Sequence, residues 1–127
     1  KKLQLLMKSA EEKTIDNKGK LINLCIAYNG QKEIVDACKS IALKAKENAF
    51  DLSKLSVDSF SDFLYNSFKF PDLIVRTSGI ERLSGFLTFQ SAYSEFYFPQ
   101  KLWPEFSKAD LKDSVDYYYS VQTNFGK

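Results

Sequence analysis

The amino-acid sequence predicts an α/β protein in which a mostly parallel β-sheet is flanked by helices. Segments with the hydrophobic spacing of helices alternate along the chain with short segments that are almost wholly apolar. This alternation is typical of layered α/β folds, and strands without a polar face are typical of parallel sheets that are buried on both sides. The chain of 127 residues has no repeat, low-complexity stretch or interdomain linker, so we expect a single domain.

Several segments have the periodicity of helices that pack one side against a core. The first carries Leu3, Leu6 and Met7 on one side and lysines and glutamates on the other. Another begins after the turn Tyr28-Asn29-Gly30 and continues through Ala45. In chain order, the predicted helices are residues 1–16, the segment after this turn, and residues 57–68, 85–94 and 110–124.

Three apolar segments are predicted to be the strands of the sheet. Residues 21–27 (LINLCIA) resemble a strand that is buried on both faces, whereas the strands at residues 72–75 and 95–98 are shorter. Glycine, proline and polar residues between these segments mark turns and connections. Three strands make a thin sheet for this class of fold, so we expect the chain to form part of a larger sheet.

The composition excludes several classes of function. No apolar run approaches the ~20 residues of a membrane-spanning helix, and a net charge of +2 is too small to indicate a nucleic-acid partner. The chain has no histidine, which excludes Ser-His-Asp hydrolysis and His-based metal sites. Cys25 and Cys38 are too few for a disulfide framework or a zinc site, so we expect free thiols and a cytoplasmic location.

The two arginines of the chain lie in one segment. Sixteen of the eighteen basic residues are lysines, and Arg76 and Arg82 are six residues apart. A guanidinium group is a rigid fork of donors that matches a phosphate or carboxylate, whereas a lysine is a solvated point charge. This distribution raises the question of which anion the segment holds.

Two loops are expected at the carboxyl ends of strands, where open parallel sheets bind their ligands. One is Tyr28-Asn29-Gly30. The other is residues 76–79, which contain two hydroxyl groups and a glycine and are followed by Arg82 and Ser84 just before a predicted helix. Arginines, hydroxyl groups and the free N–H groups of a helix start together indicate a site for a phosphate or a diphosphate.

The residues alone leave alternatives open at two places. In the alternative for the loop, Arg76 pairs with Glu81 or Asp72, while Ser84 only caps the following helix. Glu95 opens an aromatic strand, and it is either a metal ligand in dry surroundings or simply the exposed start of that strand.

Residues 71–106 carry a longer pattern. They read PDLIVRTSGIERLSGFLTFQSAYSEFYFPQKLWPEF, which closely resembles the C-terminal signature of the cis-prenyltransferases, the undecaprenyl diphosphate and dehydrodolichyl diphosphate synthases. In that family the pattern runs Arg-Thr-(Ser/Gly)-Gly-Glu-x-Arg-(Leu/Ile)-Ser-x-Phe-Leu, then Gln-x-Ala-Tyr-x-Glu, then Leu-Trp-Pro-(Asp/Glu)-(Phe/Tyr). The upstream segment LINLCIAYNGQKEIVDA is similar to another block of the family.

The resemblance implies an enzyme that condenses an allylic diphosphate, typically farnesyl diphosphate, with successive isopentenyl diphosphate units to make a long-chain polyprenyl diphosphate. It implies that Arg76, Arg82 and Ser84 grip the diphosphate of isopentenyl diphosphate, and that Glu95 is associated with Mg²⁺, which polarises the leaving diphosphate. The substrate-binding residues that the resemblance implies are Arg76, Glu81, Arg82, Leu83 and Ser84.

The sequence also departs from the family pattern. Ile80 stands where the family usually has Glu, which puts a hydrogen bond of that Glu in doubt, and Gln31 replaces an Arg of the upstream block. The family's N-terminal block, with an Asp in a Gly-Asn-Gly-Arg setting, is absent from this sequence. We therefore expect residues 1–127 to be the C-terminal portion of a single cis-prenyltransferase domain, inactive alone, with the catalytic residues upstream of Lys1.

The resemblance leaves two assemblies open, a homodimer and a mixed pair with a related subunit, together with association at the surface of the endoplasmic reticulum or plasma membrane. The alternative function is a non-catalytic partner subunit of a mixed enzyme. Such subunits lose the Arg-Thr-Ser-Gly and Arg-Leu-Ser residues and keep a C-terminal Arg-x-Gly, whereas this chain has the former and carries Asn124-Phe125-Gly126 near its end. The catalytic type is therefore favoured, and an unrelated phosphate-binding α/β domain is the third option.

Overall fold

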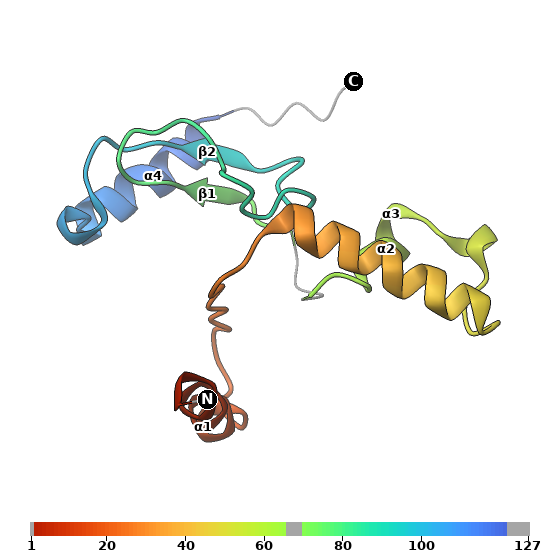
Figure 1. Ribbon diagram of the computed structural model, residues 1–127. Helices are drawn as coiled ribbons and strands as arrows, with labels where there is room; N and C mark the ends of the chain where they lie inside the picture. The colour runs from red at the N-terminus through yellow and green to blue at the C-terminus, as the bar shows by residue number, and fades with distance from the viewer. Residues whose placement is uncertain (1, 66–69, 122–127) are drawn as a thin grey trace.

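The computed structural model of the protein describes residues 2–65 and 70–121 (Figure 1). Within these ranges, helices and a small parallel sheet follow one another along the chain, which confirms the predicted α/β class. The elements are the helices α1 (Lys2–Thr14), α2 (Gly30–Lys46), α3 (Val57–Ser61) and α4 (Lys108–Ser120), the strands β1 (Leu73–Val75) and β2 (Glu95–Tyr97), and two 3-10 helices, Leu52–Lys54 and Trp103–Glu105.

β1 and β2 pair in parallel, with Ile74 opposite Phe96 at the centre of the register. Branched and aromatic side chains fit the half-buried surface of a sheet, and residues 76–94 form the crossover that two parallel strands require. α4 lies along this sheet (Figure 1), where the ring of Tyr117 is 5.2 Å from that of Tyr97. The predicted strands at 72–75 and 95–98 are therefore confirmed within one residue.

α2 begins where the sequence provides a cap. The side chain of Asn29 accepts a hydrogen bond from the N–H of Lys32 (3.0 Å), which satisfies one of the donors that every helix start leaves unpaired. Ala37 and Ile41 lie one turn apart and are buried, as the apolar spacing predicts. Two lysines occupy the last turn, where positive charge favours the helix dipole.

The predicted strand at residues 21–27 is wrong. This segment is exposed chain without a strand partner in the described ranges, and Leu21, Ile22 and Leu24 are 78%, 80% and 76% exposed. An apolar run becomes a buried strand only when neighbouring strands pair with its backbone and other elements cover its faces. Among the described residues β1 and β2 pair only with each other, so residues 21–27 have no such surroundings.

Residues 85–94 do not form the predicted helix and instead belong to a series of turns. Ser84, Gly85 and Leu87 have φ angles of 51°, 80° and 45°, and residues in this left-handed region interrupt the regular hydrogen bonding of an α-helix. The segment nevertheless enters the core, because the side chain of Leu87 is buried. No helix therefore starts after residues 76–84, which we call the arginine loop.

The other helices differ from the prediction mainly at their ends. α3 is shorter than the predicted segment 57–68, of which residues 66–68 lie outside the described part of the chain. α4 begins slightly earlier than predicted, because Ser107 and Asp110 form a capping box. The predicted end of that helix, residues 122–124, also lies outside the described part.

Candidate functional site

Arg76 stands at the carboxyl end of β1 and fixes the loop that follows. Its backbone N–H donates to the carbonyl oxygen of Tyr97 (3.0 Å), which extends the parallel ladder by one residue. Its Nη1 donates to the hydroxyl oxygen of Ser84 (2.9 Å) and to the carbonyl oxygen of Arg82. The structure thus brings the Arg76 side chain to the Ser84 hydroxyl and to the backbone of Arg82, whereas no side-chain contact within the described ranges places the Arg82 guanidinium group beside them.

The backbone of this loop is held in an uncommon conformation. Ser78 has a φ of 80° and Gly79 a φ of 64°, and this left-handed region costs a residue with a side chain roughly 1–2 kcal/mol. The N–H of Ser78 donates to the carbonyl oxygen of Lys101 (2.7 Å), and that of Gly79 donates to Pro99 (2.9 Å). The segment after β2 therefore holds the loop in a strained shape, a feature that often marks ligand sites.

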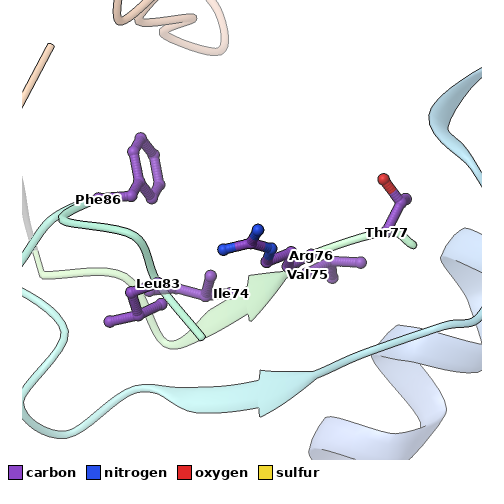
Figure 2. Close-up of a pocket in the computed structure, with 6 residues that line it drawn as sticks. All are labelled: Ile74, Val75, Arg76, Thr77, Leu83 and Phe86. Carbon is purple, nitrogen blue, oxygen red and sulfur yellow. The ribbon is translucent and has the colours of Figure 1, made fainter. Parts of the chain in front are cut away.

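A small pocket opens beside the Arg76 side chain. Its volume is about 260 Å³, and Figure 2 shows the guanidinium group of Arg76 between Phe86 and Thr77. The lining residues are Ile74, Val75, Arg76, Thr77, Leu83 and Phe86. One cationic group beside a mainly apolar wall suits a small ligand with an anionic head and an apolar body.

The alternative roles of the loop residues are not found. Among the described residues, neither Arg76 nor Arg82 forms an ion pair with any carboxylate, including those of Glu81 and Asp72. Ser84 caps no helix, because turns follow it. The prediction that the N–H groups of a helix start contribute to the anion site is wrong for the same reason. The two guanidinium charges are therefore not neutralised within the described ranges.

The second loop that the sequence singled out, Tyr28-Asn29-Gly30, lies against Gly85 and Phe86, which follow the arginine loop. The N–H of Gly30 donates to the carbonyl oxygen of Gly85 (2.7 Å), and the ring of Tyr28 meets that of Phe86 edge-on at 5.9 Å. The prediction that this loop stands at the end of a strand is wrong, because residues 21–27 form no strand. The loop stands at the start of α2. It supports the segment that carries Phe86, one wall of the pocket.

Sequence reasoning missed Glu33, a carboxylate that is only 2% exposed. Its Oε2 accepts hydrogen bonds from the Tyr28 hydroxyl (2.5 Å) and from Nε2 of Gln90 (2.9 Å), and its Oε1 accepts one from the backbone N–H of Tyr65 (2.9 Å). Burial, together with the hydrogen bond to Glu33, raises the pKa of Tyr28 well above its usual range. The spacing held the missed signal, since Glu33 lies four and eight residues before two buried residues of α2.

Glu95 lies at the opposite end of the sheet from Arg76. It opens β2, where its Cα pairs with that of Leu73, and its N–H donates to the carbonyl oxygen of Asp72 (2.9 Å). Because the strands are parallel, Glu95 is at the amino edge of the sheet and Arg76 at the carboxyl edge. One chain therefore does not bring these two side chains to the same end of the sheet.

Within one chain, the described side chains do not assemble a complete magnesium site. No group of three His, Cys, Asp or Glu residues able to hold a metal occurs among them, and Cys25 and Cys38 are exposed free thiols, as predicted. Magnesium is usually held by one or two carboxylates together with substrate phosphates. Glu95 supplies one carboxylate, but the arginine loop lies at the other edge of the sheet.

Known proteins are similar to this sequence along nearly its whole length. A family model described as "Putative undecaprenyl diphosphate synthase" matches residues 1–126. The chain belongs to the cis-prenyltransferase family. A tritrans,polycis-undecaprenyl-diphosphate synthase (geranylgeranyl-diphosphate specific) of Methanocaldococcus jannaschii is 42% identical to this chain, over 100% of the chain and 46% of the archaeal protein. Isoprenyl transferase 1 of Corynebacterium glutamicum is 39% identical, over 95% of the chain and 56% of the relative.

Solved structures of the family have the same fold. The lavandulyl diphosphate synthase of Lavandula x intermedia, in complex with dimethylallyl diphosphate, matches with a TM-score of 0.94 at 37% identity, over 98% of this chain and 54% of that protein. A probable undecaprenyl diphosphate synthase of Campylobacter jejuni matches with a TM-score of 0.83 at 28% identity, over 99% and 57%. The chain spans about half the length of the curated relatives it matches. In its described part, no helix has the length and apolar character needed to cross a membrane.

Proposed function

We propose that this chain provides the isopentenyl diphosphate site of a cis-prenyltransferase, which condenses an allylic diphosphate such as farnesyl diphosphate with isopentenyl units into a long-chain polyprenyl diphosphate. One observation carries the proposal. Arg76 lines a pocket with apolar walls, and neither it nor Arg82 of the same loop has a neutralising carboxylate among the described residues. An unneutralised pair of guanidinium groups attracts a diphosphate and matches its oxygens.

The loop is arranged to receive the diphosphate before it binds. The hydrogen bonds of Arg76 to Ser84 and to the Arg82 carbonyl hold the guanidinium group in place, so binding orders less of the side chain. The oxygen of Ser84 accepts from Arg76, and its own proton can be donated to a phosphate oxygen. Arg82 is exposed and adds a second positive charge, and Glu81 and Leu83 complete the proposed substrate-binding segment.

The apolar walls suit the hydrocarbon part of the same substrate. Ile74, Leu83 and Phe86 contribute apolar side chains to the lining of the pocket (Figure 2), and burial of apolar surface there favours a hydrocarbon ligand. A pocket of about 260 Å³ is smaller than the ~300–1,000 Å³ typical of drug-sized ligands. It therefore suits the five-carbon isopentenyl unit better than a long allylic chain.

We further propose that Glu95 acts in a site to which a second subunit contributes. Glu95 and Arg76 would lie at the same end of the sheet only if β2 were antiparallel to β1, and the two strands are parallel. Magnesium, when bound, supplies Lewis-acid polarisation of a diphosphate. In the complete enzyme Glu95→Gln should raise the magnesium concentration needed for half-maximal rate, and an unchanged requirement would leave Glu95 as the start of a strand.

The proposed enzyme works as a homodimer or as a mixed pair with a related subunit. We place it in the cytoplasm, at the surface of the endoplasmic reticulum or plasma membrane, because a long polyprenyl product is apolar and partitions into a bilayer. The family's partner subunits keep a C-terminal Arg-x-Gly, and this chain has Asn124 in place of that arginine. Asn124 lies outside the described residues.

Calorimetric titration of the purified protein with isopentenyl diphosphate and with inorganic pyrophosphate tests the proposed site. We expect both ligands to bind, and we expect Arg76→Ala to weaken both by about ten- to a hundredfold, the effect of losing hydrogen bonds from a charged group. Lys13→Ala is the matched control, since it removes a positive charge from α1, which lies apart from the sheet (Figure 1). Equal losses in the two variants would show a general charge effect and contradict the proposal.

A further inference from the structure

Glu33 is a buried carboxylate that forms no ion pair with the proposed diphosphate loop or with any other described residue. Glu33 is 2% exposed, and three donors from three segments of the chain point at its two oxygens: Tyr28, Tyr65 and Gln90. A buried carboxylate is costly unless such donors replace its water. The arrangement around Glu33 therefore ties these segments to the first turn of α2.

Two of the three donors lead to the proposed site. The ring of Tyr28 packs edge-on against Phe86 at 5.9 Å, and Phe86 lines the pocket beside Arg76 (Figure 2). Gln90 belongs to the same series of turns as Ser84, which accepts the hydrogen bond of Arg76. Glu33 thus holds one end of this segment, and Arg76 holds the other.

The segment between these two anchors lacks a regular hydrogen-bond pattern that would fix its shape. Ser84, Gly85 and Leu87 all have positive φ angles, and such conformations persist only where surrounding contacts enforce them. The N–H of Gly30 adds one such contact, because it donates to the carbonyl oxygen of Gly85 (2.7 Å). Gly30 lies in the same first helical turn as Glu33.

We propose that Glu33 is a positioning residue of the diphosphate site, which fixes residues 84–90 relative to Arg76 so that the Ser84 hydroxyl and the Phe86 ring are in place before substrate binds. This inference rests on the proposed function, because it assigns Glu33 to the same site. A site that is ordered in advance loses less entropy on binding, and the gain is measured as affinity.

Exchanging the side chains of Glu33 and Gln90 tests whether the hydrogen-bond arrangement, rather than the glutamate at position 33 itself, supports binding. The Oε1 of Gln90 is buried without a hydrogen-bond partner among the described residues, and the Nε2 of Gln90 and the Tyr28 hydroxyl donate to the same oxygen of Glu33. In Glu33→Gln, an amide NH₂ group meets other donors. In the double variant Glu33→Gln/Gln90→Glu, the carboxylate moves to position 90, where it can accept from Tyr28 and from the new amide. The amide oxygen at position 33 can still accept from the N–H of Tyr65.

The experiment compares isopentenyl diphosphate binding by calorimetry in the wild type, Glu33→Gln, the double variant and Asp36→Asn. Asp36 is the matched control, since it is a half-buried acid of α2 that contacts Lys32 and the hydroxyl of Tyr65. We expect Glu33→Gln to weaken binding about tenfold, the effect of leaving buried donors unpaired. We expect the double variant to recover to within about threefold and Asp36→Asn to match the wild type. Amide hydrogen exchange should be faster at Gly30 in Glu33→Gln alone.

The outcomes separate this inference from the proposed function. Loss of binding in Arg76→Ala, with none in Glu33→Gln, overturns the positioning role and leaves the site in place. A wild-type protein that binds neither isopentenyl diphosphate nor pyrophosphate overturns the proposed function, and the inference with it. If Glu33→Gln does not fold, the double variant decides: wild-type affinity supports positioning, and a folded double variant with weak binding overturns it.

Discussion

At the scale of single residues, Arg76 performs two tasks with one side chain. Its Nη1 binds Ser84 and the Arg82 carbonyl within the loop, and the planar group carries further donors that a diphosphate can use. A lysine has the same charge but a single nitrogen, so it cannot hold the loop and meet the ligand in the same geometry. Charge alone therefore does not account for an arginine at this position.

This division of tasks predicts the effect of Arg76→Lys in the complete enzyme. We expect a loss of about 1–3 kcal/mol in diphosphate recognition, seen as a higher KM for isopentenyl diphosphate with a smaller change in the KM for the allylic substrate. Steady-state kinetics with each substrate varied in turn measures both values. Equal changes in the two KM values would contradict the assignment of this loop to isopentenyl diphosphate.

Tyr28 gives a prediction about pH. Burial and its hydrogen bond to Glu33 raise the pKa of Tyr28, so the folded protein favours the neutral phenol. That contribution to stability is fully present below the ordinary tyrosine pKa and is lost as the pH rises toward the raised one. Between about pH 9 and 11, the wild type should lose more of its free energy of unfolding than Tyr28→Phe does.

Urea denaturation of both proteins at several pH values checks this expectation. Lysines also titrate in this range, but their effect is common to the two proteins and cancels in the difference. A difference in the free energy of unfolding that stays constant over the whole range would mean that the Tyr28 hydroxyl titrates alike in the folded and unfolded chain.

At the scale of elements, the start of α2 couples helix stability to the site. The Asn29 side chain caps the helix, and the next residue, Gly30, donates to Gly85 behind the pocket. Asn29→Ala should lower the free energy of unfolding by about 1 kcal/mol, the usual cost of losing such a cap. Thermal or urea denaturation measures the loss. Asn17→Ala is the control, since the Asn17 side chain makes no hydrogen bond within the described ranges, and a comparable loss there would refute the capping argument.

The elements also show what local sequence can predict. α2 and the strands around Ile74 and Phe96 were predictable, because their caps, spacing and branched or aromatic residues are local signals. Residues 21–27 carry an equally apolar pattern, yet a strand depends on neighbours that no local pattern specifies. Residues 85–94 fail for another reason, since positive φ angles at serine and leucine leave no mark in composition.

The same distinction applies to the candidate site. The proximity of Arg76, Arg82 and Ser84 could be inferred from the sequence because they are close along the chain. Their role in binding a substrate stays a prediction. The helical spacing places Glu33 on the buried side of α2, but its partners Tyr65 and Gln90 are far away in sequence, so only the tertiary fold shows which donors meet it.

At the scale of the whole molecule, the parallel pairing of β1 and β2 divides the proposed machinery between two edges of the sheet. Arg76 follows β1 at one edge, and Glu95 opens β2 at the other. Two residues that serve one reaction from opposite edges require either long side-chain reach or a second subunit. In a symmetric dimer, each interface presents the same residues twice, so the Glu95 of one subunit can complete the site of its partner.

This arrangement predicts recovery of activity when two impaired variants are mixed. In a dimer of one Arg76→Ala subunit and one Glu95→Gln subunit, one site receives both substitutions and the other receives neither, provided that Glu95 acts across the interface. After unfolding and refolding of an equal mixture, half of the dimers are mixed and half of their sites are intact, so about a quarter of the wild-type activity should return. Each variant refolded alone serves as the control. If Glu95 acts within its own subunit, every site in every mixed dimer keeps one substitution, and the mixture will be no more active than the average of the two variants.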